Sequence, residues 1–134
     1  MEKLEHIGIA VKNLEESNQL FAKLLGKAHY KIEEVASEGV RTSFFELSGV
    51  KIELLEATNS SSPIAKFIEK RGEGIHHLAF EVADIKKSIQ SYLEKGFSLL
   101  SEQPKPGADN KRIAFMHPKS TNGVLVELCE EGKL

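Results

Sequence analysis

The segment His6-Ile-Gly-Ile-Ala-Val-Lys-Asn-Leu decides the fold, because a similar segment, His77-Leu-Ala-Phe-Glu-Val-Ala-Asp-Ile, follows 71 positions later. Each segment begins with a histidine and then alternates apolar residues with small or polar ones, as a half-buried strand does. Each also reaches a residue that caps helices well, Asn13 in the first and Asp84 in the second. The chain therefore begins a strand followed by a helix twice.

An amphipathic helix is predicted after each of these strands. The two helices end at Gly26 and Gly96, which lie 13 and 12 residues beyond their caps. Their apolar faces are formed by Leu20, Phe21, Leu24 and Leu25 in the first, and by Ile85, Ile89, Tyr92 and Leu93 in the second. The nearly equal lengths indicate one helix that occurs twice.

Three runs typical of strands follow each helix, and the last two of each set correspond. Arg41-Thr-Ser-Phe-Phe matches Arg112-Ile-Ala-Phe-Met, and Gly49-Val-Lys-Ile-Glu-Leu matches Gly123-Val-Leu-Val-Glu-Leu. The sequence thus predicts an α+β fold of two βαβββ modules that form a curved mixed-sheet cleft. Within one domain, residues 1–134, the modules span residues 4–57 and 75–131.

The connector between the modules, residues 58–74, is predicted to contain a short helix. Ser62 caps this helix, Pro63 occupies its first turn and Gly72 ends it. Residues 102–112 form the most polar stretch, and their two prolines and one glycine predict a loop there.

Composition limits the function classes. With 40% apolar and 28% charged residues and a net charge of -2, the chain has the mix of a globular domain and no general attraction to nucleic acid or anionic lipid. Neither a signal segment nor an apolar run of about 20 residues is present in the sequence, so we expect a cytoplasmic protein without a membrane span. Cys129, between apolar neighbours, is predicted to be a packed thiol.

Four residues at equivalent places in the two modules are candidate metal ligands: His6, Glu53, His77 and Glu127. In each strand the alternating apolar residues take the face that packs against a helix, so all four candidates fall on the opposite face. A lone histidine or edge glutamate is usually a surface or satisfied core residue. Four such residues that recur with the repeat are harder to explain in that way, and they predict a divalent metal site.

Two imidazoles and two carboxylates form a mixed nitrogen and oxygen set suited to zinc, cobalt, nickel, manganese or iron(II). In octahedral geometry such a set leaves two positions for water or substrate. His76 is interpreted as a supporting or structural residue because it faces away from its neighbour His77, and His29 and His117 are interpreted as surface or loop residues.

These blocks resemble the vicinal oxygen chelate superfamily, which includes glyoxalase I, bleomycin resistance proteins and extradiol dioxygenases. The similarity is closest to the methylmalonyl-CoA epimerases, through Ser62-Pro-Ile-Ala-Lys-Phe, Gly72-Glu-Gly-Ile-His-His-Leu-Ala-Phe-Glu-Val and Lys111-Arg-Ile-Ala-Phe-Met-His-Pro-Lys-Ser. The resemblance implies that His6, Glu53, His77 and Glu127 bind the metal, with Glu53 standing where some members carry glutamine.

The chain departs from the superfamily at one position. Some members place a glutamate base on the strand after the sequence Glu-Gly-Val. The matching position in this chain is Thr42, whose hydroxyl cannot accept a proton from carbon. The resemblance leaves Glu127 as a candidate for both ligand and catalytic base. Glu46, farther along the same strand face, is a weaker second candidate for a catalytic residue.

The implied activity is a metal-dependent epimerase that interconverts the C2 epimers of methylmalonyl-CoA by proton abstraction and an enolate. A cobalt, nickel, zinc or manganese ion would be the cofactor. Phosphate groups of an acyl-CoA substrate need cations, and four are expected to bind them: Lys105, Lys111, Arg112 and Lys119. A homodimer is also expected, because sheet edges need covering and the resemblance implies pairing of chains.

Three alternatives remain at this point. The nearest is lactoylglutathione lyase, the glyoxalase I reaction, which has similar ligands and similar chemistry. An iron(II) extradiol dioxygenase is disfavoured by the second carboxylate ligand. A ligand-binding protein of the same superfamily without catalytic activity is disfavoured by the complete ligand set.

Overall fold

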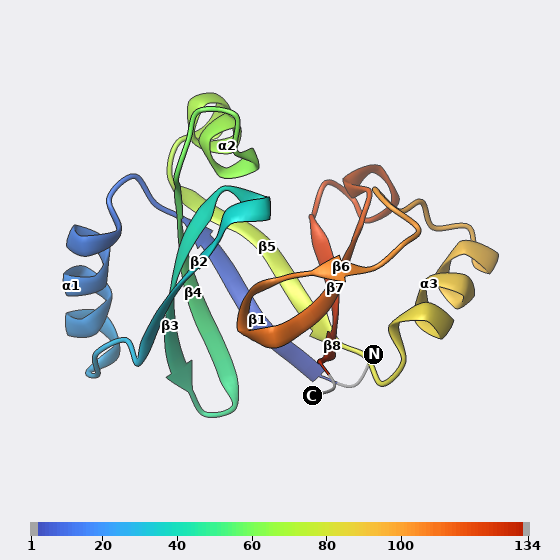
Figure 1. The fold of residues 1–134 in the computed structure, drawn as a ribbon, viewed down its shortest axis with the longest axis horizontal. Coiled ribbons are helices and arrows are strands. Elements are labelled where there is room, and N and C mark those ends of the chain that lie inside the picture. Colours follow the sequence, from blue (N-terminus) through green and yellow to red (C-terminus); the bar gives the residue numbers. More distant parts are fainter. Residues whose placement is uncertain (1–2, 133–134) are drawn as a thin grey trace. The chain divides into compact units, whose positions relative to one another are not determined.

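The structure is a computed structural model that describes residues 3–132. These residues form two compact units, and each is described by itself. One unit comprises residues 6–76, and the other comprises residues 77–132 together with residues 3–5. The strands and helices of both units can be followed in Figure 1.

The first repeat has the predicted βαβββ order. Its strands lie in the order β2-β3-β4-β1, with β1 parallel to β4 and the other neighbours antiparallel. A helix, α2, follows the repeat. The elements are β1 (Lys3–Ala10), α1 (Leu14–Leu25), β2 (Lys31–Val35), β3 (Val40–Leu47), β4 (Val50–Ala57) and α2 (Pro63–Arg71).

The second repeat has the same order of elements. Its strands lie in the order β5-β8-β7-β6, with β5 parallel to β8 and the other neighbours antiparallel. A parallel pair at one side and antiparallel pairs at the other thus occur in both repeats, which confirms the predicted α+β class. The elements are β5 (Gly74–Glu81), α3 (Ile85–Glu94), β6 (Lys105–Pro106), β7 (Lys111–Met116) and β8 (Val126–Glu131).

The predicted helix caps are present. The side chain of Asn13 accepts a hydrogen bond from the Glu16 backbone at 2.9 Å, and the side chain of Asp84 accepts one from the Lys87 backbone at 3.1 Å. Gly26 ends α1 with a left-handed φ of 75°, which a residue with a Cβ adopts only at a cost. Caps of one kind at equivalent places fix the start of the helix in both repeats.

The apolar face of α1 differs from the prediction. Leu14, Phe21 and Leu25 pack with Phe45 and other residues of the sheet, whereas Leu20 and Leu24 are 62% and 70% exposed. The buried stripe therefore follows positions 14, 18, 21 and 25. Figure 1 shows α1 lying alongside β3 and β4.

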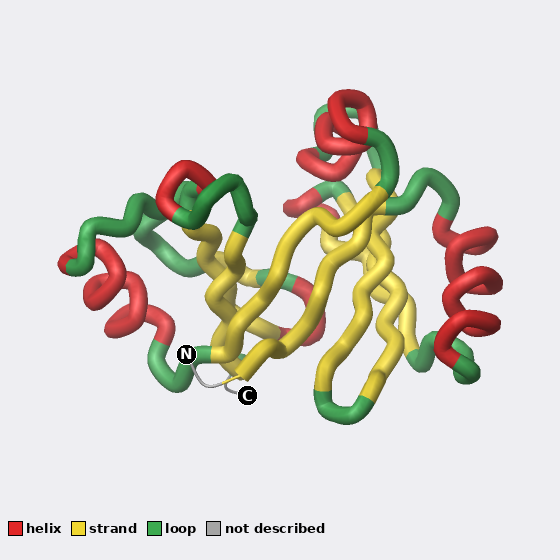
Figure 2. The backbone as a smooth tube through the Cα atoms, turned by 180° about the vertical axis from the view of Figure 1, so that it is seen from behind, coloured by secondary structure: helices red, strands yellow, loops and turns green. Residues whose placement is uncertain are grey.

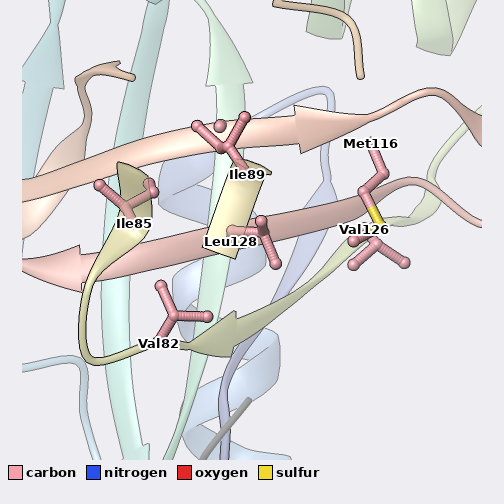
Figure 3. Packing of buried hydrophobic residues seen from close by; sticks show 7 residues of the cluster. Val82, Ile85, Ile89, Met116, Val126 and Leu128 are labelled. Atoms are coloured by element: carbon pink, nitrogen blue, oxygen red, sulfur yellow. The ribbon is translucent and has the colours of Figure 1, made fainter. Parts of the chain in front are cut away.

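The core of the second repeat lies between α3 and the sheet and contains the predicted helix residues. Figure 3 shows the packing of its buried side chains. Burial of each large aliphatic side chain contributes about 1.5–3 kcal/mol, so this cluster is the main support of the repeat. The buried members are Val82, Ile85, Ile89, Ala114, Met116, Val126 and Leu128, with Tyr92 and Leu93 packed against them.

Two strand boundaries differ from the prediction. The strand predicted from Gly123 begins only at Val126, as β8. Residues 121–124 form a turn instead, in which Thr121 Oγ1 donates a hydrogen bond to the Val124 carbonyl oxygen. The equivalent run from Gly49 begins one residue late, after a tight turn between β3 and β4 that is visible in Figure 2. The polar stretch 102–112 contains the two-residue strand β6.

Among residues 3–132, none of the helices is long and apolar enough to cross a membrane.

Candidate metal and active site

Each unit holds one histidine beside one glutamate. In the first unit, Nδ1 of His6 lies 3.1 Å from Oε2 of Glu53. The parallel pairing of β1 with β4 brings them together, since Gly8 is opposite Glu53 and His6 is two residues earlier on the same face. Both side chains are about 95% buried.

The second unit repeats this arrangement. Nε2 of His77 lies 3.4 Å from Oε1 of Glu127, again with both side chains buried. The pairing of β5 with β8 places Ala79 opposite Glu127, so the small alanine takes the position that glycine takes in the first unit. The ring of His77 also packs edge-on against Phe115, with 5.8 Å between ring centroids, which limits its rotation.

The distances within the two pairs fit a shared metal ion. Two donor atoms that each lie about 2.1 Å from one ion are roughly 3.0 Å apart at a right angle and roughly 3.4 Å apart at a tetrahedral angle. A charge-assisted hydrogen bond between the same groups would be about 2.7–2.9 Å long. Buried carboxylates need a positive partner, and the chemistry of the donors therefore suits a divalent cation.

All four candidates lie on the sheet face opposite α1 or α3, as predicted, whereas α2 packs against Val40 and Leu55 on the face of Glu53. In the first unit, Leu54 and Phe45 pack with α1, so their strand neighbours Glu53 and Phe44 face away from that helix. In the second unit, Leu128 packs with α3, so Glu127 faces away. Alternation along the strands accounts for the placement of these side chains.

The remaining histidines lie in other environments. His76 packs edge-on against Phe67 of α2, with 5.0 Å between ring centroids. Burial lowers the pKa of His76 to about 4, so its imidazole is neutral near pH 7. His29 packs against Phe45 at 5.9 Å, and Nδ1 of His117 accepts a hydrogen bond from the Lys119 backbone at 3.1 Å.

Thr42 and Glu46 differ sharply in their surroundings. Thr42 is 1% exposed, and its hydroxyl oxygen has no hydrogen-bond partner among residues 3–132. Glu46 is half exposed near the end of β3, where its carboxylate accepts a hydrogen bond from the Gly49 backbone at 2.8 Å and lies 3.7 Å from Nζ of Lys27. The carboxylate of Glu46 therefore closes a turn.

The four candidate phosphate-binding cations occupy three kinds of position. Lys105 is exposed, and its Nζ lies 5.8 Å from the centre of the Phe115 ring, on the face of Glu127. Lys111 lies on that face too, but it is buried and forms an ion pair with Glu131. Arg112 points to the opposite face, where it pairs with Glu130 at 3.3 Å. Lys119 is exposed in a 3₁₀ turn.

Sequence analysis overlooked two acidic residues. Glu5 is 3% exposed, directly before His6. Glu33 lies on β2 opposite Thr42 in the strand register, and its carboxylate is 3.6 Å from Nζ of Lys31. Strand alternation around Thr42 could have identified Glu33, because residues paired across strands share a face. No comparable pattern marks Glu5.

Cys129 is a packed thiol, as predicted. It is completely buried, and its sulfur lies 3.5 Å from the carbonyl oxygen of Phe80. Burial, and next the negative charges of Glu127 and Glu5, raise the pKa of the Cys129 thiol far above its ordinary value. The thiol is therefore neutral near pH 7.

We expect Cys129 to be unreactive toward a thiol reagent such as DTNB in the native protein, because the thiolate is the nucleophile and is not formed. Less than a tenth of the thiol should react in an hour at pH 8, and one thiol per chain should react in guanidinium chloride. Cys129→Ser supplies the blank. Complete labelling of the native protein would contradict the buried position.

The chain is similar to known proteins over nearly its whole length. Residues 5–115 match the Glyoxalase/Bleomycin resistance protein/Dioxygenase superfamily. The mitochondrial methylmalonyl-CoA epimerase of Dictyostelium discoideum is 41% identical over 96% of this chain and 78% of its own length. The ethylmalonyl-CoA/methylmalonyl-CoA epimerase of Cereibacter sphaeroides is also 41% identical, over 94% of this chain and 96% of its own.

Solved structures agree with the sequence comparisons. The methylmalonyl-CoA epimerase of Mycobacterium tuberculosis superimposes with a TM-score of 0.92 at 36% identity, over 97% of this chain and 88% of that one. A methylmalonyl-CoA epimerase in complex with methylmalonyl-CoA and NH4+ superimposes with a TM-score of 0.91 at 32% identity, over 98% and 95%. The predicted relationship to these isomerases is confirmed.

Proposed function

Because the chain belongs to the Glyoxalase/Bleomycin resistance protein/Dioxygenase superfamily, we propose that it is an epimerase that interconverts the C2 epimers of methylmalonyl-CoA. The observation that carries the proposal is the buried histidine–glutamate pair that occurs once in each unit, in a chain 41% identical to two epimerases that act on this class of substrate. An acyl-CoA is therefore the expected small-molecule partner.

We assign the two pairs, His6 with Glu53 and His77 with Glu127, to one divalent ion, with cobalt, nickel, zinc or manganese as candidates. Two neutral imidazoles and two carboxylates balance the charge of such an ion. When bound, the ion would stabilise the negative charge that develops on the thioester oxygen. The chain's own contribution is to hold the four donors buried.

Glu127 is the proposed base that takes the proton from C2. Its carboxylate is buried, which keeps competing water from the reacting carbon. One carboxylate oxygen lies 3.4 Å from Nε2 of His77. A base in position contributes about a hundredfold to ten-thousandfold to the rate. The electrons of the broken C–H bond move toward the thioester carbonyl and form an enolate.

The phosphates of the substrate are proposed to bind the exposed cations Lys105, Arg112 and Lys119. Lys105 lies on the sheet face of Glu127 and is therefore the best placed of the three. Lys111 is the fourth cation of the proposed phosphate-binding set. It also forms an ion pair with Glu131 at the start of β7.

Charge reversal at Lys105 is expected to raise the KM for methylmalonyl-CoA about tenfold, because a phosphate contact is replaced by repulsion. Metal content should not change, because none of the four ligands is altered. The matched control is Lys86→Glu, which makes the same charge change at an exposed position on α3. An equal rise of KM in both variants would show that only net charge matters.

The deciding experiment is proton NMR in deuterated water of the metal-loaded protein. Loss of the C2 proton signal of methylmalonyl-CoA, with appearance of the other epimer, supports the epimerase. Conversion of the glutathione hemithioacetal of methylglyoxal, without exchange in methylmalonyl-CoA, would instead identify a lactoylglutathione lyase.

A homodimer in the cytoplasm completes the proposal. Sedimentation at micromolar concentration should show a species of twice the 14.9 kDa chain mass. Only a monomer under those conditions would contradict the dimer and leave the proposed reaction unaffected.

A further inference from the structure

Two neighbouring hydroxyls on β3, those of Thr42 and Ser43, lack a hydrogen-bond partner among residues 3–132. Thr42 is 1% exposed, and Ser43 is fully buried. A buried hydroxyl without a partner destabilises a folded protein, because its hydrogen bonds to water are lost and no other polar group replaces them. Each of the two hydroxyls therefore needs an explanation.

The strand register separates the two hydroxyls. Ser43 is opposite Leu54, which packs with α1, so alternation places Ser43 on the face that this helix covers. Thr42 alternates to the other face, which also carries the proposed metal ligand Glu53. Thr42 is opposite Leu55, two residues beyond Glu53 along β4, and such diagonal neighbours are roughly 7–8 Å apart. Of the two hydroxyls, only that of Thr42 thus lies on the face of the candidate site.

Thr42 lies between two parts of this face of the first unit. At one end α2 packs against Val40 and Leu55, and at the other end Phe44 is opposite Glu53. Thr42 is about as buried as Glu53, which is 4% exposed. A substrate group that is held near the Glu53 carboxylate would therefore come within reach of the Thr42 hydroxyl.

The charges beside Thr42 are compatible with an anionic group. Its neighbour on β2 is Glu33, whose carboxylate lies 3.6 Å from Nζ of Lys31. The same ammonium group lies 4.5 Å from the centre of the Phe44 ring. A carboxylate of a ligand would therefore meet a balanced pair of charges rather than Glu33 alone. The Glu33 side chain is 34% exposed, so it can turn toward solvent when a ligand enters.

We propose that the Thr42 hydroxyl donates a hydrogen bond to the free carboxylate of methylmalonyl-CoA and thereby selects carboxylated acyl groups, a role that rests on the proposed function. An ionised carboxylate only accepts hydrogen bonds, and a hydrogen bond to a charged acceptor is about twice as strong as one between neutral groups. The hydroxyl gains its partner only when the substrate is bound. It therefore strengthens substrate binding and lowers the stability of the free protein.

The binding test uses Thr42→Val, which removes the hydroxyl and keeps a branched side chain of similar size. Calorimetric titration of the metal-loaded protein compares methylmalonyl-CoA with propionyl-CoA, which lacks the free carboxylate. We expect Thr42→Val to raise the Kd for methylmalonyl-CoA at least tenfold and to leave the Kd for propionyl-CoA within twofold. The matched control is Ser43→Ala, which removes the hydroxyl on the other face and should leave both Kd values within twofold.

The stability test uses the same variants without ligand. Thr42→Val should melt at the same temperature as the wild type or at a higher one, because it no longer buries a hydroxyl without a partner. Thr42→Ser keeps the hydroxyl and should bind methylmalonyl-CoA within threefold of the wild type. If Thr42→Val does not fold, Thr42→Ala replaces it in the binding test, with the same expected change for each ligand.

The outcomes separate this proposal from the proposed function. A loss of less than tenfold for methylmalonyl-CoA, or an equal loss for propionyl-CoA, would overturn the role of Thr42 while the wild type remains an epimerase. A lower melting temperature of Thr42→Val would also overturn it, since the hydroxyl would then be satisfied within the protein. A wild-type protein that does not bind methylmalonyl-CoA overturns both proposals.

Discussion

Replacement of His77 by alanine is expected to leave the purified protein with less than a tenth of the divalent metal that the wild type retains after dialysis. Removal of this imidazole leaves three of the four proposed ligands and takes the partner of the Glu127 carboxylate away. Loss of a group that merely supports a metal ligand already costs about 10- to 100-fold in metal affinity. His6→Ala should have the same effect, since its distance to Glu53 is similar to that of His77 to Glu127.

Elemental analysis of the dialysed proteins measures the metal content. The matched control is His29→Ala, because the His29 ring packs against Phe45 and His29 is not one of the four proposed ligands. The wild type should also unfold at a lower temperature after treatment with a chelator, since a ligand that binds only the native state stabilises it. Full metal occupancy in the double variant His6→Ala, His77→Ala would rule out the proposed site.

Glu127→Gln is expected to lower kcat for epimerisation by at least a hundredfold while more than half of the metal is retained. The amide keeps an oxygen that can bind the ion, but it cannot accept a proton from carbon. The rate is measured by NMR or by a coupled assay, and metal content by elemental analysis of the same sample.

Glu53→Gln makes the same chemical change in the other unit. It is expected to cost less than tenfold in kcat, because Glu53 is assigned only a ligand role. Equal losses in the two variants would mean that the base is neither of these residues, or that both act through the metal alone.

The repeat made much of the fold predictable. Strand alternation and helix caps are local properties, and the βαβββ order, the caps at Asn13 and Asp84 and the face of the four candidate ligands followed from them. The candidate ligands were identifiable because each occurs twice, and because a strand residue's face depends only on its neighbours.

Other features depend on tertiary packing. The first helix has more apolar residues than its buried stripe can hold, so the sequence does not decide between Leu20 and Leu25 as packing residues, and the position of the sheet does. Lys111 was predicted among the cations that bind the substrate phosphates, yet it is buried beside Glu131. Adjacent cations such as Lys111 and Arg112 alternate between faces, which a count of charges does not reveal.

The outermost strands of the two repeats have a consequence for self-association. β6 has two residues and one of them is Pro106, which lacks a donor N–H, while β2 carries Lys31, Glu33 and Glu34 within five residues. Both are features that hinder continuation of a sheet by another chain. A second copy would therefore have to associate through side chains, and the exposed Leu20 and Leu24 lie about one helical turn apart on α1. Growth into long β-structured aggregates is disfavoured at these two strands for the same reason.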